Sequence, residues 1–358
     1  REVVTPGNWQ SIIFDEAHNL RNQGESIKAH RGRVLAESAN HAIFATATPL
    51  DKPHGIYYLN SLLVDRGGNK ISPEVALLKV GLEKVVTTDP RTGDIVTQFN
   101  PVEDVTMEQI ENNIDLLFDN MTRAGLAVKH EVPLDNIDIN FKQVQLTPDQ
   151  HAEVKKHMDD AQAQYELRGM PFGAIQRLVM MTGRAALESQ KALQAMELTK
   201  QLVSDGRQVV LFASRVNGGQ WNLDNGLAQM FADLNRDLPN QVGRLFGSAP
   251  TEAARAAKQE TIDKFQEGTY KVVLATPETG GTGVSLDDLY GDAPRTLIAI
   301  TPPFSALEFV QMAGRVNRLN TASRAEMYIL DSGHRLDSWN SGIILAKLRA
   351  LGAAVEGE

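Results

Sequence analysis

The stretch SIIFDEAH, from Ser11 to His18, decides how the fold begins, because an apolar run ends there in an acidic pair. A short apolar run bounded by polar residues predicts a buried strand, here over residues 10–15. A helical pattern follows over 24–40, and HAIFAT at 41–46 predicts a second strand. Strand, helix and strand at this spacing predict two parallel strands joined by a crossover.

The second half of the chain repeats this alternation of strands and helices. The sequence predicts strands at 137–146, 208–213, 242–246, 271–275, 296–300 and 326–330, and helices at 149–168, 172–204, 251–267, 305–313 and 336–350. We therefore expect an α/β fold with two parallel-sheet lobes, the first of them incomplete. The expected domains are 1–65, an accessory insertion at 66–135 and a second lobe at 136–358, from which the helices within 149–204 protrude. Within the insertion, a helix is predicted over 103–123. A further helix is predicted over 55–63, just before the insertion begins.

Composition excludes several classes of protein. The chain of 358 residues contains no cysteine, so structural disulfides and thiolate-bound metal sites are excluded. Its apolar runs are no longer than strands, so no membrane span is expected, and nothing resembles a signal peptide. These features fit an intracellular protein. The net charge of −9 argues against nucleic-acid binding over the whole surface but leaves a local cleft open.

The acidic pair at the end of the first strand suits magnesium and water chemistry. Magnesium prefers oxygen ligands and keeps most of its waters, so Asp15 could hold it through water. Glu16 could polarise an attacking water, and His18 could sense a γ-phosphate. The alternative interpretation of these residues is an ordinary strand end followed by a polar turn.

Hydroxyl groups follow other predicted strands. Thr46 and Thr48 come directly after the second strand and could relay the state of a bound nucleotide. The glycine-rich stretch TPETGGTGVSL at 276–286 would let the backbone approach a phosphate closely. Thr282 and Ser285 there could contact a sugar–phosphate backbone, although a flexible loop is the alternative.

The stretch QMAGRVNR at 311–318 carries two arginines three residues apart, beside a glycine. Residues i and i+3 share a face of a helix, so Arg315 and Arg318 would point the same way. Arginines placed in this manner can stabilise the charge of a transferring phosphoryl group. The alternative is a surface helix with weak ion pairs.

In this order the motifs resemble those of superfamily 2 helicases and translocases. Asp15–His18 resembles the DEAH form of motif II, and Thr46-Ala47-Thr48 resembles motif III. The strand Val209–Ser214, the stretch Gly280–Leu286 and Gln311–Arg318 resemble motifs IV, V and VI. The residues around them are similar to Swi/Snf-type double-stranded DNA translocases and to strawberry-notch-type helicases.

The resemblance implies RecA-like lobes with ATP between them, a helicase C-terminal domain in the second lobe, and double-stranded DNA as the partner. It implies that ATP and magnesium are the cofactors of a hydrolase in the complete protein. In this resemblance Glu16 is the catalytic base, Arg315 and Arg318 are arginine fingers, and Asp15 contacts magnesium through water. Thr46 and Thr48 couple ATP to nucleic acid. The remaining implied contacts are with the nucleotide for His18, Gly283, Gln311 and Gly314, and with nucleic acid for Ser214, Thr276, Thr282 and Ser285.

The chain departs from the family in one respect, because no P-loop sequence GxxxxGK[ST] occurs. Without that loop the backbone cradle and the lysine for the β- and γ-phosphates are missing. We therefore expect a fragment that needs an N-terminal segment or a complementing chain, and that hydrolyses little ATP alone. Two alternatives stay open: a non-catalytic module that binds nucleic acid or protein, and an RNA helicase.

Overall fold

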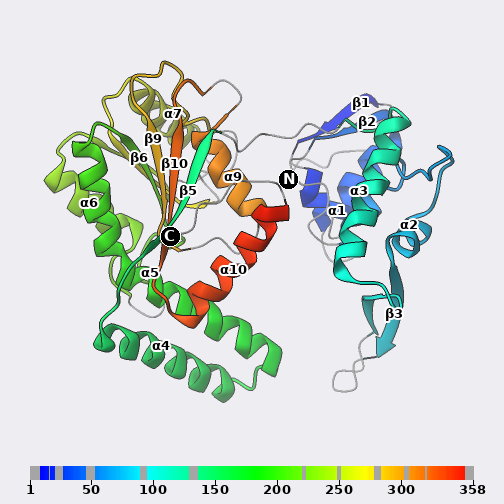
Figure 1. Ribbon diagram of the computed structural model, residues 1–358, viewed down its shortest axis with the longest axis horizontal. Helices are drawn as coiled ribbons and strands as arrows, with labels where there is room; N and C mark the ends of the chain where they lie inside the picture. Colours follow the sequence, from blue (N-terminus) through cyan, green and yellow to red (C-terminus); the bar gives the residue numbers. More distant parts are fainter. Residues whose placement is uncertain are drawn as a thin grey trace. The chain divides into compact units, whose positions relative to one another are not determined.

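The computed structural model describes residues 9–15, 17–20, 27–45, 53–88, 95–128, 136–219, 223–247, 251–277, 284–301, 306–318 and 321–350. The chain divides into two compact units, unit 1 with residues 1–131 and unit 2 with residues 132–358 (Figure 1). Each unit is described by itself. Parallel strands alternate with helices in both, which confirms the prediction of an α/β fold.

Unit 1 opens with the predicted crossover. Strands β1 (Trp9–Phe14) and β2 (Ala39–Phe44) pair in parallel, and helix α1 (Ile27–Ser38) lies between them in the chain. The rings of Phe14 and Phe44 stack with their centroids 5.3 Å apart. Ile13 and Ile43 are more than half exposed on this two-stranded sheet. The first lobe therefore has a parallel sheet, but a small one.

The remainder of unit 1 packs against this start. Its elements are η1 (Ala17–Leu20), η2 (Pro53–Leu59), α2 (Pro73–Val80), the antiparallel hairpin β3 (Leu82–Thr88) with β4 (Ile95–Pro101), and α3 (Met107–Arg123). The helix predicted over 55–63 is wrong, because only a 3₁₀ segment ending at Leu59 forms there. Ile56 and Leu63 pack with Leu77, Ile110 and Met121 in one buried cluster. Residues from the expected insertion therefore share a core with residues from the expected lobe.

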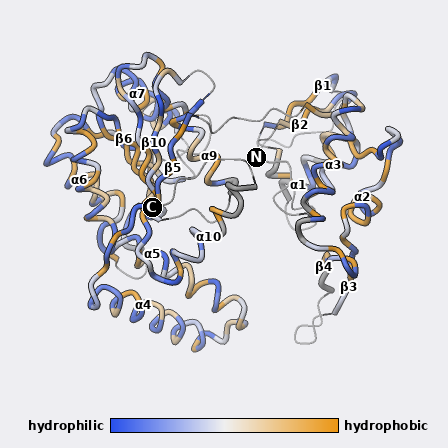
Figure 2. Tube along the Cα trace, viewed as in Figure 1, coloured by the Kyte–Doolittle hydropathy of each residue, from blue (hydrophilic) through white to orange (hydrophobic). Residues whose placement is uncertain are grey.

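Unit 2 is built on a six-stranded, wholly parallel sheet in the order β5-β10-β9-β6-β8-β7. The strands are β5 (Ile137–Gln143), β6 (Gln208–Phe212), β7 (Val242–Leu245), β8 (Val272–Ala275), β9 (Arg295–Ala299) and β10 (Ala325–Asp331). Each lies within about two residues of its predicted position, apart from the longer predicted end of the first. The central strands are mostly hydrophobic (Figure 2), as expected for a sheet that is covered on both faces.

The helices of unit 2 are α4 (Pro148–Leu167), α5 (Phe172–Ser204), α6 (Leu227–Asp237), α7 (Glu252–Gln266), α9 (Ala306–Val316) and α10 (Arg335–Ala350). Five were predicted, and α6 was missed. Leu227, Met230 and Leu234 are buried along one face of α6, at helical spacing. Polar residues between them and the short length of the helix made that pattern easy to overlook.

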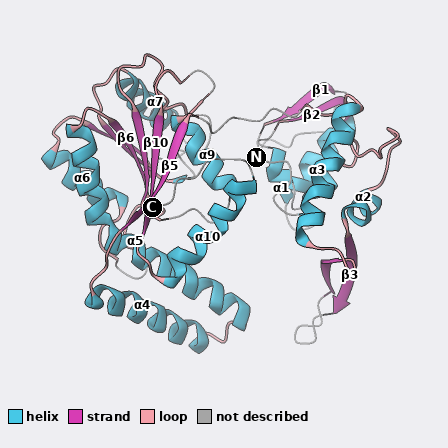
Figure 3. Ribbon diagram, in the orientation of Figure 1, coloured by secondary structure: helices cyan, strands magenta, loops and turns pink. Residues whose placement is uncertain are grey.

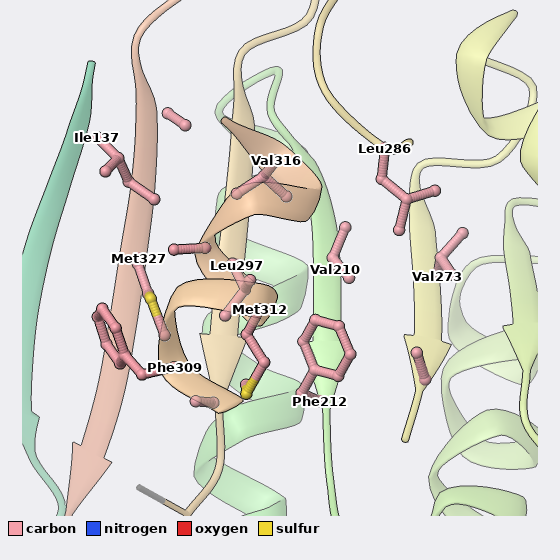
Figure 4. Close-up of a cluster of buried hydrophobic side chains, with 14 of the residues drawn as sticks. Ile137, Val210, Phe212, Val273, Leu286, Leu297, Phe309, Met312, Val316 and Met327 are labelled. Carbon is pink, nitrogen blue, oxygen red and sulfur yellow. The ribbon is translucent and has the colours of Figure 1, made fainter. Parts of the chain in front are cut away.

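The helices form layers on both faces of the sheet (Figure 3). Val210 and Phe212 of β6 pack with residues of α7, α9 and α10. Figure 4 shows Phe309, Met312 and Val316 of α9 in this cluster. Val209 and Leu211 of the same strand pack with residues of α5 and α6 on the other face. Side chains alternate along a strand, so the apolar run 209–213 serves both cores.

Helices α4 and α5 pack against each other, and the later part of α5 also packs on the sheet, where Ala192 and Leu202 lie in one cluster with Val209. That the pair protrudes from the second lobe stays a prediction. Thr147 caps α4 as expected: its hydroxyl accepts from the Gln150 amide, and Pro148 occupies the first turn. None of the helices in the described segments is both long and apolar enough to span a lipid bilayer.

Candidate functional site

In unit 1, the acidic pair begins where β1 ends. Asp15 is exposed and directly follows Phe14. The Phe14 carbonyl accepts a hydrogen bond from Ala45 N at 2.9 Å, and Ala17 N donates to Ala45 O at 2.9 Å. The backbone on both sides of the acidic pair is therefore held against the carboxyl end of β2, just before the position of Thr46.

Several predicted site residues lie outside the described part of the chain. These are Glu16, Thr46, Thr48, Thr282 and Gly283. The backbone of His18 belongs to η1, but its side chain is not among those described. Their roles stay predictions.

In unit 2, Arg315 and Arg318 converge on one carbonyl group. Arg315 lies in the last turn of α9 and is 6% exposed, and its Nη1 donates to Val284 O at 3.0 Å. Arg318 lies beyond the end of α9, so the expectation that the two arginines share a helix face is wrong. Arg318 is exposed, and its Nη2 donates to the same oxygen at 3.0 Å. Leu286 N in turn donates to Arg315 O at 2.9 Å. The structure thus joins the predicted arginine pair to the end of the glycine-rich stretch.

The other predicted residues of this stretch are Gln311 and Gly314, both half-buried on α9. A Cβ atom built on Gly314 would meet no heavy atom of the described residues within 4 Å. Lys258 of α7 carries a further positive charge near this site: burial lowers its pKa, and the charge of Arg315 lowers it further. Neighbouring cations make the surroundings of Arg315 favourable for an anion.

The backbone of residues 284–288 also accepts hydrogen bonds from side chains of α7 and β9. Arg295, 1% exposed, donates from Nε to Leu286 O at 3.1 Å and from Nη2 to Gln266 Oε1 at 3.1 Å. Gln266 Nε2 donates to Ser285 O at 3.1 Å. The hydroxyl of Ser285, predicted to contact nucleic acid, donates to Asp287 Oδ1 at 2.5 Å. The backbone of this segment is therefore tied to α7 and β9 as well as to the arginines.

Ser214 and Thr276 follow β6 and β8, two neighbouring strands of the sheet. Ala213 N donates to Ala275 O at 3.2 Å, so the chain stays paired up to these residues. Ser214 is exposed, and it lines a small cavity together with Arg184, Glu188, Pro277, Thr301 and Met312. In the described residues, the buried Thr301 hydroxyl has no hydrogen-bond partner. Ligands of parallel sheets bind at this carboxyl edge.

Glu188 of α5 organises the loop that begins at Ser214. Its carboxylate is 1% exposed and accepts from Ser214 N at 2.8 Å, Ser214 Oγ at 2.7 Å and Arg215 N at 3.1 Å. The guanidinium of Arg215 lies 3.6 Å from the same carboxylate. Burial lowers the pKa of Arg215, and the charge of Glu188 opposes this shift.

Sequence reasoning missed Glu188, Lys258, Asp287 and Arg295. Two of them carried a signal, since Glu188 interrupts an apolar helical face and Arg295 opens a strand of apolar residues. A charged residue at a buried position is costly unless it is paired, so such interruptions point to a specific partner. The partner itself comes from a distant part of the chain.

The described part of the chain contains side chains of the types that magnesium and phosphate groups require. No group of three or more metal-ligating side chains occurs among them. Magnesium needs only one or two carboxylates, however, and Asp15 is exposed at a strand end. The exposed guanidinium of Arg318 provides donors of the kind that recognise phosphate.

Comparisons with known proteins find a helicase domain within unit 2. Residues 190–320 match the helicase conserved C-terminal domain. A protein of Acanthamoeba polyphaga mimivirus, named as an ATP-dependent RNA helicase, is 28% identical over 127 residues, which are 36% of this chain. The chain spans about one fifth of the length of that relative, since the match covers 20% of it.

Two solved structures are also similar. The C-terminal part of the Fun30 ATPase domain is 13% identical, with a TM-score of 0.39 over 58% of this chain and 88% of that one. Dbp5 of S. cerevisiae bound to RNA and ADP BeF3 is 12% identical, with a TM-score of 0.45 over 98% of this chain and 60% of that one. The domain match and the viral relative together support a helicase C-terminal domain within unit 2, over residues 190–320.

Proposed function

We propose that this chain is part of an ATP-dependent helicase or translocase of superfamily 2, with unit 2 as its C-terminal lobe. The observation that carries the proposal is the convergence of Arg315 and Arg318 on Val284 O, inside the segment that matches the helicase domain. A surface helix with ordinary ion pairs does not require two arginines on one carbonyl.

The proposed roles of Arg315 and Arg318 follow from how exposed each one is, and those of the other residues follow from the resemblance to superfamily 2 helicases. Asp15 holds magnesium through water, and Glu16 takes the proton from the attacking water. Arg318 is exposed and lies beyond the helix, so it stabilises the charge of the transferring phosphoryl group. Such an arginine contributes roughly 10³–10⁵ in rate. Arg315 is buried, so its role is to hold the backbone at Val284 in place. In this proposal His18, Gly283, Gln311 and Gly314 contact the nucleotide. Thr46 and Thr48 couple hydrolysis of the nucleotide to the bound nucleic acid.

The proposed substrate is duplex DNA, in keeping with the resemblance to Swi/Snf-type and strawberry-notch-type proteins. Ser214, Thr276, Thr282 and Ser285 contact it in this proposal, along the carboxyl edge of the sheet. RNA is the second candidate, favoured by the name of the viral relative. The complete protein requires a P-loop segment from outside the 358 residues.

The experiment is ATP hydrolysis with and without double-stranded DNA, on this chain and on a longer version that includes a P-loop segment. We expect DNA-stimulated turnover only in the longer version, abolished by Glu16→Gln. Glu197→Gln is the matched control, because Glu197 is exposed on α5. An equal stimulation by RNA would favour the second candidate.

Two results would count against the proposal. Strong turnover by the 358-residue chain would show that no further segment is needed. No turnover in either version would favour a non-catalytic module that binds nucleic acid or protein.

A further inference from the structure

Arg318 is placed by contacts with Val284 and Thr321 rather than by a helix. Helix α9 ends at Val316, so the helical backbone does not hold Arg318. Its guanidinium donates to Val284 O at 3.0 Å, and its backbone N–H donates to Thr321 Oγ1 at 2.6 Å. The position of this exposed arginine therefore depends on what holds Thr321.

Thr321 is held by Asp287. Its Oγ1 lies 3.5 Å from Asp287 Oδ2, and its N–H donates to Arg318 O at 3.1 Å. An ionised carboxylate only accepts hydrogen bonds, so the single hydroxyl hydrogen of Thr321 points to Asp287. This orientation leaves the lone pairs of Oγ1 for the Arg318 N–H.

Asp287 is 1% exposed, and the second oxygen of its carboxylate accepts from Ser285 Oγ. No ion pair of Asp287 occurs in the described segments. A buried carboxylate costs free energy unless it is hydrogen-bonded. Its two oxygens thus connect one hydroxyl of the glycine-rich segment with one hydroxyl beside the arginine.

We propose that Asp287 positions Arg318 through Thr321, and that Ser285 makes this position respond to nucleic acid. The inference rests on the proposed function, because it assumes that Arg318 acts on a nucleotide. Asp287 and Thr321 are positioning residues, since neither touches the reacting groups.

The response follows from the single hydrogen of a hydroxyl group. Phosphate oxygens of nucleic acid only accept, so Ser285 cannot donate to a phosphate and to Asp287 Oδ1 with the same hydrogen. When Ser285 turns to a phosphate, the carboxylate loses its short hydrogen bond. The long contact of 3.5 Å to Thr321 is then the one that can shorten. Nucleic acid would thereby hold Thr321 and the Arg318 amide more firmly.

The first test measures hydrogen exchange of backbone amides in residues 316–322 of the 358-residue chain. Thr321→Val and Asp287→Ala should each make the Arg318 amide exchange about fivefold faster, the effect of losing one hydrogen bond. Thr321→Ser should restore the protection, and Ser285→Ala should not reduce it. Unchanged exchange in Asp287→Ala would overturn the proposal, and near-ultraviolet circular dichroism would show whether each variant is folded.

The second test uses the longer, ATP-hydrolysing version. Thr321→Val should lower kcat for ATP severalfold with and without nucleic acid, while KM stays within about twofold. Ser285→Ala should raise the basal rate and reduce the stimulation by nucleic acid. Ser204→Ala is the control, because its hydroxyl donates to Gln201 O at the exposed end of α5. A Ser285→Ala protein with an unchanged ratio of stimulated to basal rate would contradict the coupling.

The two tests separate the inference from the proposed function. If the longer wild-type protein hydrolyses no ATP, the proposed function fails and the coupling to catalysis fails with it. The exchange experiment still decides whether Asp287 and Thr321 hold Arg318.

Discussion

Two glycines inside helices of unit 2 have opposite surroundings, and this difference predicts opposite effects of alanine. Among the described residues, none comes within 4 Å of a Cβ built on Gly314, whereas a Cβ on Gly183 would lie 2.6 Å from Met158 Sδ and 2.8 Å from Leu336 Cδ1. We expect Gly314→Ala to stabilise unit 2 by about 0.5–1 kcal/mol, because alanine favours the helix. Gly183→Ala should destabilise it by about 1–3 kcal/mol through overpacking.

Urea unfolding of both variants measures these effects. The open space beside Gly314 is where we propose the nucleotide to lie, so Gly314→Ala should also lower ATP turnover in the longer version. A Gly314→Ala protein that is less stable than wild type would show that the space is already filled within the unit.

We expect His334 to make the stability of unit 2 depend on pH. Its ring stacks on His151 with centroids 5.8 Å apart, and its Nδ1 accepts from Leu336 N at 3.3 Å. Burial lowers the pKa of His334, and the charges of His151 and Lys191 act in the same direction against Asp337. The unfolded chain therefore binds a proton more readily than the folded one. The contribution of the neutral His334 ring to the stability of unit 2 should be fully present above about pH 6.5 and should be lost as the pH falls below that value.

The measurement is the free energy of unfolding from pH 8 to pH 5. His334→Asn keeps an acceptor for Leu336 N without titrating, so its pH dependence should be flatter than that of wild type. Identical curves for the two proteins would assign the dependence to other groups.

At the scale of elements, α5 supports the loop that follows β6. Glu188 accepts three hydrogen bonds from Ser214 and Arg215, and Ser189 Oγ donates to Asp224 O at 2.8 Å. Removing the carboxylate would leave the partly buried donors Ser214 N and Arg215 N without their acceptor and the Arg215 guanidinium without the negative charge beside it. The Nη atoms of Arg215 would keep backbone carbonyls as acceptors. We expect Glu188→Ala to cost about 3–5 kcal/mol, as for breaking a buried ion pair.

Chemical denaturation checks this value, with Glu197→Ala as the control on the same helix. Glu197 is exposed, so its substitution should change stability by no more than about 0.5 kcal/mol. Hydrogen exchange should also rise across residues 214–219 in Glu188→Ala. If Glu188→Ala behaved like the control, α5 would not be what holds this loop.

At the scale of the whole molecule, the two units differ in how completely they bury their sheets. The six-stranded sheet of unit 2 has a buried cluster on each face. The two-stranded sheet of unit 1 leaves Trp9, Ile13 and Ile43 exposed. We expect residues 132–358 to fold alone with a cooperative thermal transition, whereas residues 1–131 alone should bind the dye ANS. A broad transition for residues 132–358 would mean that this unit depends on the other.

Much of the architecture could be predicted from local pattern. The apolar runs at 11–14 and 209–213 predicted strands, and Thr147 with Pro148 predicted the start of α4. Parallel pairing followed, because helices separate consecutive strands. The 3₁₀ segment at Pro53–Leu59 and the helix α6 were not predicted correctly. Both are short, and short segments take their conformation from packing more than from their own periodicity.

The sequence by itself determined the α/β class and the positions of the strands in unit 2. These depend on periodicity and spacing, which act over a few residues. Only the tertiary structure decided that both arginines share Val284 O, that Asp287 holds Thr321 and that Glu188 accepts from Ser214. Such contacts join residues from 26 to 34 positions apart. Their partners are chosen by how the strands and helices pack, so no local pattern contains them.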